Sequence, residues 1–359
     1  MPSRSAPDSS SNIPPDVVDE PLDFEELDEA PDASGWVPPE VPWLRVAVGA
    51  EGHGRRIDQW LVTQVPTFSR SHLKHLIEAG AVLVDGVAVT SAARKLQAGQ
   101  QVVAELRPTA QSTSFTPEAM DLDILFEDDH LMVVNKPVGL VVHPAAGNWQ
   151  GTLLNGLLAH HRGAAQLPRA GIVHRLDKDT SGLMVVGKTQ EACVALTKAI
   201  ALRDVHRQYR ALVWGEPPES FRVDLPIGRD LVSRVRMGVV KGGKPAMTDV
   251  VTIATLPVEQ KFRTVGGVLH SEISAVECTL HTGRTHQIRV HLSSRHHPLV
   301  ADSVYGGKPE LGMTRQALHA FRLSLVHPHT GEALSFEAEM PADMACAWAQ
   351  VVHNEAPSA

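Results

Sequence analysis

The chain has 359 residues, of which 43% are hydrophobic, and this length predicts about two folded units of ordinary globular composition. No apolar run approaches the roughly 18 residues that a membrane helix needs, and the first twenty residues lack the apolar segment of a secretory signal. The three cysteines, Cys193, Cys278 and Cys346, have no C-x-x-C spacing, which argues against a disulfide framework and a cysteine zinc site. We therefore expect a soluble protein of a reducing cytoplasm.

The acidic residues are concentrated at the N-terminus. Residues 1–40 contain eleven Asp or Glu against Arg4, or −10, so the formal charge of −8 for the whole chain leaves +2 for the remainder. Residues 1–42 are also rich in Pro and Ser, and such a composition cannot bury enough apolar surface to offset chain entropy. We expect a disordered acidic tail that either solubilises the protein or screens its basic body from indiscriminate nucleic-acid binding.

Residues 43–107 have the pattern of a small separate module. The stretches RRIDQWLVTQV and SRSHLKHLIEAG are helical, with Ser69 as the expected N-cap and Gly80 as the expected C-terminal stop of the second helix. Arg70 and Lys74 are four residues apart and so share a helix face. Two apolar runs joined by Asp85-Gly86 then predict a β-hairpin.

The segment from RIDQWLVTQV through ARKLQAGQQV resembles an S4 domain, a small RNA-binding module of ribosomal proteins and RNA-modifying enzymes. This resemblance implies that Arg56, Arg70, Ser71 and Lys74 lie on or near the RNA-facing side, where cations and polar groups contact phosphates. The alternative is an ordinary solvated helix face.

Residues 108–120 have the composition of a linker, and a second domain is expected over 121–345, followed by a C-terminal tail over 346–359. Short apolar runs alternate with turn signals in this domain, and the strands are expected in HLMVVNKP, GLVVHP, GIVHRL, GLMVVGKT, QYRALVWG, AVECTLHTG and HQIRVHL. Helical patterns are limited to GTLLNGLLAHH and TQEACVALTKAIALRD. The fold class is therefore α+β, with a large mixed, mainly antiparallel sheet.

Two patterns in this domain resemble familiar sites without fitting them. Residues 238–244, GVVKGGK, satisfy G-x-x-x-x-G-K, but Pro245 stands where a phosphate-binding loop needs Ser or Thr, so we expect a hairpin-like turn. The histidines at 281, 286, 291 and 296 recur every five residues. This spacing does not place them on a common face of a helix or of a strand. Scattered structural histidines explain them better than a shared metal.

The segment TGRTHQIRVH, if it is extended, places Gln287, Arg289 and His291 on one side and apolar residues mostly on the other. Such a strand is either half-buried with a solvated arginine, or it points Arg289 into a cleft where the guanidinium holds an anion.

The stretch HRLDKDTSG lies between two runs with the pattern of buried strands, AGIV and LMVV. If residues 175–177 are extended, Arg175 and Asp177 emerge on the same face, and residues 179–182 supply turn chemistry. Composition favours a charged surface turn, while its position between rigid elements is typical of a loop that displays functional side chains.

The stretch GIVHRLDKDTSGLMVV resembles the signature of the RluA/RluD family of pseudouridine synthases. VNKPVGLVVHP, RQYRALVWG, TGRTHQIRVH, HPLVADSVYGG and QALHAFRL resemble its other motifs in the same order. With the S4-like segment and VVHPAAGNWQGTLLNGLLAHH, the chain is most similar to the RluD branch. The resemblance implies the pseudouridine synthase fold with a central cleft, and a soluble enzyme that isomerises uridines of 23S ribosomal RNA, in the helix 69 loop, without metal or organic cofactor.

The resemblance also implies the roles of four residues. Asp177 is the nucleophile, Arg289 pairs with it and keeps it ionised, Tyr209 stacks on the target base, and Arg175 fills the space that the base vacates in the RNA. The partner is then 23S rRNA or the assembling large ribosomal subunit, and the protein is a monomer. Three alternatives stay open: a synthase acting on another rRNA or tRNA site, a non-catalytic RNA-binding ribosome-assembly factor, and a hydrolytic N-glycosidase.

Overall fold

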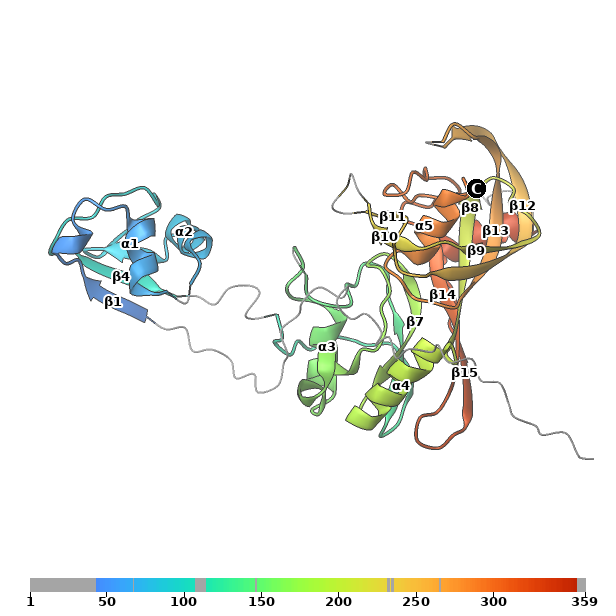
Figure 1. Cartoon of the computed structure of the whole chain (residues 1–359), viewed down its shortest axis with the longest axis horizontal. Helices are drawn as coiled ribbons and strands as arrows, with labels where there is room; N and C mark the ends of the chain where they lie inside the picture. The colour runs from blue at the N-terminus through green and yellow to red at the C-terminus, as the bar shows by residue number, and fades with distance from the viewer. Residues whose placement is uncertain are drawn as a thin grey trace, which may run out of the picture. The chain divides into compact units, whose positions relative to one another are not determined.

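The computed structural model describes residues 43–66, 68–106, 114–145, 147–230, 233, 236–264 and 266–353 (Figure 1). The predicted acidic tail over 1–42 and the first part of the predicted linker, residues 108–113, lie outside the described residues. Within the described ranges, no helix is long and apolar enough to cross a membrane.

The N-terminal module is a four-stranded sheet with two helices on it (Figure 1). Its strands follow the order β1-β4-β2-β3, all antiparallel. The elements are β1 (Trp43–Ala47), the short 3-10 helix η2 (Ala50–Gly52), α1 (Ile57–Gln64), α2 (Arg70–Glu78), β2 (Val82–Val84), β3 (Val87–Ala88) and β4 (Gln101–Glu105). The module has its own apolar core, in which Trp60, Leu73 and Val102 are fully buried.

The local signals in this module act as predicted. The Ser69 hydroxyl caps α2 by accepting a hydrogen bond from the amide of His72 at 3.2 Å. Asp85 and Gly86 have φ of 52° and 79°, the left-handed pair that a two-residue hairpin turn requires. The predicted helices and hairpin are therefore confirmed.

The described chain divides into two compact units whose boundary crosses β7 (Ser181–Gly187). One unit contains the described residues from Trp43 to Asp179 together with Met184–Gln190. Besides the N-terminal module and the end of β7, it holds β5 (Ile124–Glu127), β6 (Leu131–Lys136), α3 (Leu153–His160), η3 (Ala164–Gln166) and η4 (Pro168–Gly171). Asn155 of α3 donates to the carbonyls of Ser114 and Thr116, so the second part of the predicted linker is packed on this unit.

The other unit contains Thr180–Leu183 and the chain from Glu191 onwards. The first residues of β7 pair parallel with β14 (Leu318–Val326), and antiparallel pairing continues through β8 (His206–Trp214), β13 (Leu269–Leu280), β12 (Met247–Arg263) and β9 (Ser220–Asp224). The sheet is thus mixed and mainly antiparallel, and the α+β prediction is confirmed. The remaining elements are α4 (Gln190–Leu202), β10 (Ile227–Arg229), β11 (Met237–Val239), α5 (Gln287–Ser294), β15 (Ala333–Glu337) and α6 (Ala342–His353).

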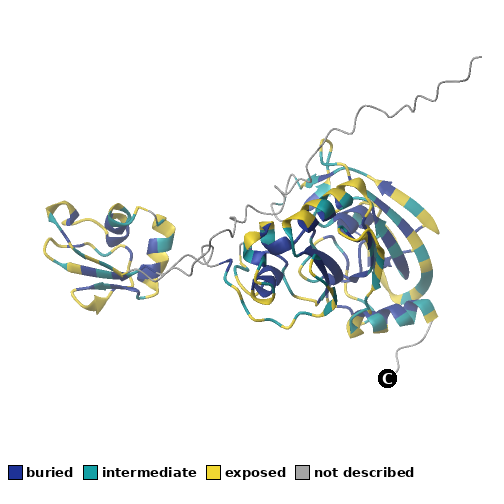
Figure 2. Ribbon diagram, turned by 90° about the horizontal axis from the view of Figure 1, so that it is seen from below, coloured by how far each residue is buried: buried dark blue, intermediate teal, exposed yellow. Residues whose placement is uncertain are grey.

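Three sequence-based predictions are wrong in this region. The segment GLVVHP is a loop, and GIVHRL is the end of η4 followed by a mostly buried loop with a single bridge between Ile172 and Val186. HQIRVHL is helix α5 instead of a strand. The domain boundary at 345 falls inside α6, whose buried Trp348 and Val351 belong to the core of this unit, so the folded part extends to 353. Figure 2 shows buried residues in the central strands and exposed ones on the outer helix faces.

Candidate active site

Asp177 lies in a loop, residues 174–180, that is anchored on both sides of it. Upstream, Nε2 of the buried His174 accepts a hydrogen bond from the amide of Val185 in β7 at 3.0 Å. Downstream, the carbonyl of Lys178 accepts from the amide of Gly139 at 2.9 Å and from Nζ of Lys136 at 3.0 Å. The loop is therefore fixed to rigid elements directly before and after the carboxylate that the sequence singled out.

Lys136, the last residue of β6, is a buried cation that serves this anchoring. Its side chain is 1% exposed, and Nζ also donates to the carbonyls of Pro137 and Leu140 at 2.9 Å each. An ammonium has three N–H donors, and three carbonyls of two loops receive them. The lysine thus joins the loop after β6 to the loop that carries Asp177.

His143 is a buried histidine that is affected by the positive charges of Arg175 and Arg169. Burial, followed by the charges of Arg175 and Arg169, lowers the pKa of His143 to about 3, so the imidazole is neutral.

Arg169 and Ala170 have φ of 50° and 54°, and Gly171 has φ of 86°, so three consecutive residues are left-handed. A Cβ at Gly171 would lie 1.9 Å from the carbonyl oxygen of Gly187, which only glycine permits. Backbone strain of this kind gathers at functional sites.

Tyr209 projects from the interior face of β8, a central strand of the other unit. It is 4% exposed and lies opposite Cys278 of β13 and Ala320 of β14. Arg207 shares this face of the strand, because side chains two residues apart point the same way. Both are buried polar groups in a strand that is otherwise apolar toward its end.

Arg289 lies in α5 and is held by Asp302 in a bidentate ion pair. Its Nε is 2.7 Å from Oδ2 and its Nη2 is 2.9 Å from Oδ1, and both side chains are buried. Oδ1 of Asp302 also accepts from the amide of Tyr305 at 3.2 Å. The Arg289 guanidinium lies over the Tyr305 ring, 5.0 Å from its centre, which is within the range of a cation–π contact.

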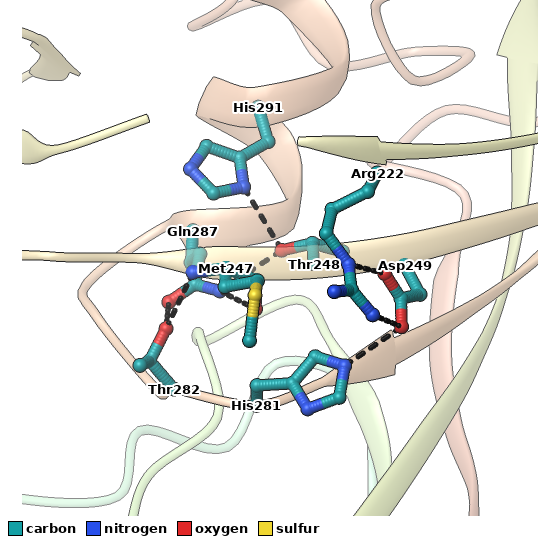
Figure 3. Close-up of polar contacts among 8 residues, drawn as sticks. All are labelled: Arg222, Met247, Thr248, Asp249, His281, Thr282, Gln287 and His291. Atoms are coloured by element: carbon teal, nitrogen blue, oxygen red, sulfur yellow. Dashed lines mark hydrogen bonds and ion pairs between the residues drawn. The ribbon is translucent and has the colours of Figure 1, made fainter. Parts of the chain in front are cut away.

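A hydrogen-bond network fixes α5 on both sides of Arg289 (Figure 3). The Gln287 amide donates to the Met247 carbonyl at 3.0 Å and to the Thr248 hydroxyl at 2.9 Å, while its oxygen accepts from Thr282 at 2.7 Å. One turn later, Nδ1 of His291 is 2.9 Å from the same Thr248 hydroxyl. Gln287 and His291 therefore both bind the start of β12, and α5 cannot rotate without breaking these hydrogen bonds.

Tyr305 connects this helix to the β10–β11 hairpin. Its hydroxyl accepts from the amide of Met237 at 3.0 Å and is 2.7 Å from Nδ1 of His286. The guanidinium of Arg236 lies 5.3 Å from the ring centre. Tyr305 thus contacts both Arg289 and the β10–β11 hairpin. The hairpin and the turn after it carry the exposed basic residues Arg229, Arg236 and Lys241.

The predicted RNA-binding residues of the N-terminal module are all exposed. Arg56 and Arg70 converge on the buried Asp58, at 3.0 and 2.8 Å. The hydrogen bond from Arg56, aided by Arg70, lowers the pKa of Asp58 to about 2 despite its burial. Ser71 and Lys74 lie on α2, and Lys74 is 3.6 Å from Glu78. Asp58 therefore holds two of the predicted phosphate-contacting arginines at one place.

Comparison with known proteins shows the family. Residues 130–294 match the sequence model of the RNA pseudouridylate synthases, and residues 55–102 match that of the S4 domain. The protein called Ribosomal large subunit pseudouridine synthase D in Neisseria meningitidis is 48% identical over 313 residues, which are 84% of this chain and 80% of the relative. The chain belongs to the RNA pseudouridine synthases.

Further proteins align with between 63% and 84% of the chain. The protein of the same name in Nitrosomonas europaea is 48% identical, and the alignment covers 84% of this chain and 85% of the relative. The one in Vibrio parahaemolyticus is 42% identical, and the alignment covers 81% of this chain and 89% of the relative. The solved structure of human RNA Pseudouridylate Synthase Domain Containing 1 aligns at 27% identity and a TM-score of 0.47, covering 63% of this chain and 87% of that one.

In this synthase the sequence-predicted catalytic residues are divided between the two compact units. Arg175 and Asp177 belong to one, and Tyr209 and Arg289 belong to the other. The pairing of Arg289 with Asp177 stays a prediction, and the bidentate partner that the structure gives Arg289 is Asp302.

The sequence analysis did not assign roles to Lys136, Gln287 or Asp302. Lys136 and Asp302 stand in the stretches VNKPVG and VADSVYGG that carried the family resemblance. A charged residue at the end of a buried apolar run was the available signal for both.

Proposed function

We propose that this protein converts specific uridines of large-subunit ribosomal RNA, in the helix 69 loop of 23S rRNA, to pseudouridine. The likeness to synthases named for the large ribosomal subunit carries this proposal. The reaction breaks the bond from ribose C1′ to uracil N1, turns the detached base, and forms a bond from C1′ to C5. The C5 proton is lost and N1 gains a proton, so the reaction is an isomerisation.

In this proposal Asp177 is the nucleophile. Attack at C1′, addition at C6 and glycal formation all need an ionised carboxylate at the target nucleotide. The anchoring of residues 174–180 by His174 and Lys136 supports the role, because a carboxylate on a fixed loop needs little reorganisation in the transition state.

The proposed roles of the other residues follow from their chemistry. Tyr209 offers an aromatic surface for the uracil, which must leave the RNA stack to react. Arg289 supplies the positive charge that keeps Asp177 ionised, and its buried pair with Asp302 fixes the plane of the guanidinium. Arg175 fills the space that the base leaves in the RNA.

Substrate binding is proposed to rest on the RNA backbone. Arg56, Arg70, Ser71 and Lys74 of the S4 domain are exposed cations or hydroxyls suited to phosphates. Such contacts make the affinity fall with rising salt. We propose that the enzyme works in the cytoplasm as a monomer on 23S rRNA or the assembling large subunit, without a cofactor.

The test is to map pseudouridine across the rRNA and tRNA of cells with and without this protein. We expect pseudouridine to disappear from the helix 69 loop and to return when the wild-type gene is restored. Loss at another rRNA or tRNA position would contradict the proposed target while leaving the reaction in place. Unchanged pseudouridine at every position would contradict the proposed function.

A further inference from the structure

Arg207 is a buried cation, and two of its three guanidinium nitrogens have no hydrogen-bond partner in the part of the chain that the structure describes. It lies on the interior face of β8, two residues before Tyr209, and is 5% exposed. Nε and Nη2 of its guanidinium are shielded from solvent and have no hydrogen-bond partner among the described residues. Buried polar groups are nearly always paired, so this pair of donors requires an explanation.

Other arginines of the same unit show what this edge of a guanidinium binds. Arg289 with Asp302, Arg315 with Asp343, and Arg222 with Asp249 all use Nε and Nη2 together against two carboxylate oxygens. The distances are 2.7 and 2.9 Å, 2.8 and 2.9 Å, and 2.6 and 2.8 Å, respectively. Arg207 presents the same two-donor edge without the two oxygens.

The buried charge is costly as it stands. Burial lowers the pKa of Arg207 and the neighbouring Tyr209 raises it, but a guanidinium stays protonated in proteins. A buried charge without an acceptor destabilises the fold, and an apolar residue of the same volume would be tolerated better. A partner that supplies two acceptor oxygens during function would remove this cost.

The surroundings of Arg207 place it beside the substrate-binding elements of its unit. A Cβ at Gly283 would lie 2.7 Å from Nη1 of Arg207, so the loop leading into α5 passes directly against the guanidinium. Arg207 and Tyr209 are separated by two strand positions, or about 7 Å. This separation is on the scale of one nucleotide.

We propose that RNA binding opens access to the shielded Nε–Nη2 edge of Arg207, which then binds two oxygens of a phosphate next to the target uridine, while the base occupies the position at Tyr209. A two-donor edge matches a group that carries two acceptor oxygens on one atom. RNA has no carboxylate, and a uracil carbonyl offers one oxygen, so the phosphodiester fits best. The identity of this phosphate as substrate rests on the proposed function.

The first test compares the thermal unfolding of the full-length protein and of Arg207→Met, with inorganic phosphate or with chloride at the same ionic strength. Arg315→Met is the control, because it leaves Asp343 without its partner. We expect Arg207→Met to unfold at the wild-type temperature or above it, and Arg315→Met to unfold lower. Phosphate should raise the midpoint of the wild type more than that of Arg207→Met. A fall in the Arg207→Met midpoint as large as that of Arg315→Met would show a structural role and overturn the proposal.

The second test measures binding of an RNA hairpin of helix 69 sequence, with an uncharged methylphosphonate placed on the 5′ or the 3′ side of the target uridine in separate RNAs. At one of these positions we expect wild-type affinity to fall about 10- to 100-fold. Arg207→Met should bind that RNA and the unmodified RNA equally, at the weakened level. Arg207→Lys should recover little, because an ammonium lacks the two-donor edge.

Equal losses of affinity in the wild type and in Arg207→Met at both positions would overturn the assignment. So would a loss that follows replacement of a uracil carbonyl oxygen instead of a phosphate. If the wild type formed no pseudouridine in this RNA, the proposed function would fail, while the binding and unfolding measurements would still decide whether Arg207 holds a phosphate.

Discussion

Arg289 and Asp302 meet through two parallel hydrogen bonds of 2.7 and 2.9 Å, with both side chains almost fully buried. The pair joins α5 to the loop after residue 299, and the amide of Tyr305 gives the aspartate a third contact. A carboxylate that is fixed in this way determines the plane of the guanidinium, and therefore the direction of its other N–H groups.

Asp302→Asn should reduce catalysis more than binding. The amide keeps one acceptor oxygen but places an N–H group against the guanidinium, so Arg289 loses its fixed plane. We expect the single-turnover rate to fall about 100-fold, as for the loss of an oriented catalytic contact, with RNA affinity nearly unchanged. Filter binding and single-turnover assays on the same RNA measure the two effects. The control is Asp343→Asn on α6, which breaks a similar pair with Arg315 and should lower stability alone. Equal rate losses in both variants would contradict a positioning role for Asp302.

Gln287→Glu should loosen α5 without removing a charge that contacts substrate. A carboxylate cannot donate to the Met247 carbonyl or the Thr248 hydroxyl, so each loses one hydrogen bond and keeps only its contact with the His281 amide or with His291. The expected loss of unfolding free energy is about 1–3 kcal/mol, together with a lower turnover rate. Urea unfolding and single-turnover kinetics measure the two quantities. Gln350→Glu, at an exposed contact on α6, is the matched control and should change neither. A stable Gln287→Glu enzyme of wild-type rate would show that the network does not hold Arg289.

Lys136→Met should release the loop that carries Asp177. Three carbonyls lose their buried donor, which should cost about 3 kcal/mol or more. Hydrogen exchange of backbone amides is the measurement, and exchange should speed up over residues 137–142 and 174–180 before it does so elsewhere. Uniformly faster exchange over the whole unit would indicate general destabilisation instead.

The S4 domain should lose stability in acid because of Asp58. The ordinary pKa of the carboxyl is 3.8, and in the fold it is about 2. A lowered folded-state pKa adds stability that is complete above the ordinary value and is lost as pH falls toward the folded one. Unfolding of the isolated range 43–107 should therefore become easier between about pH 4 and pH 2, and Asp58→Asn should be less stable at pH 6 with a weaker pH dependence in this window. An identical acid dependence in the variant would refute the assignment. In the other unit the hydrogen bond from Arg222 lowers the pKa of Asp249 to about 2, so Asp249→Asn should likewise weaken the acid dependence of the full-length protein.

The sequence was sufficient where local chemistry decides the structure. Ser69 caps its helix and Asp85-Gly86 forms its turn because each signal acts within a few residues. The mainly antiparallel sheet also followed from apolar runs of strand length. The motifs that resembled the synthase family were found by identity of residues, which no periodicity would have supplied.

The failure to predict helix α5 has a physical cause. Residues 287–292 are buried on every side, polar residues included, so alternation of polarity could not separate a strand from a helix there. The polar members are tolerated because Gln287 and His291 are satisfied by β12, a contact about 40 residues away in the sequence. The partnership of Arg289 with Asp302 and the three acceptors of Lys136 likewise depend on tertiary contacts that spacing does not encode.

The central claim is that Asp177 carries out the isomerisation, and the most direct measurement is single-turnover pseudouridine formation by Asp177→Asn. The asparagine has nearly the same shape and cannot act as a carboxylate, so we expect wild-type unfolding and RNA affinity with no detectable product. Asp204→Asn, which removes an exposed carboxylate after α4, should keep the wild-type rate. Pseudouridine formed by Asp177→Asn at a rate close to that of Asp204→Asn would contradict the account.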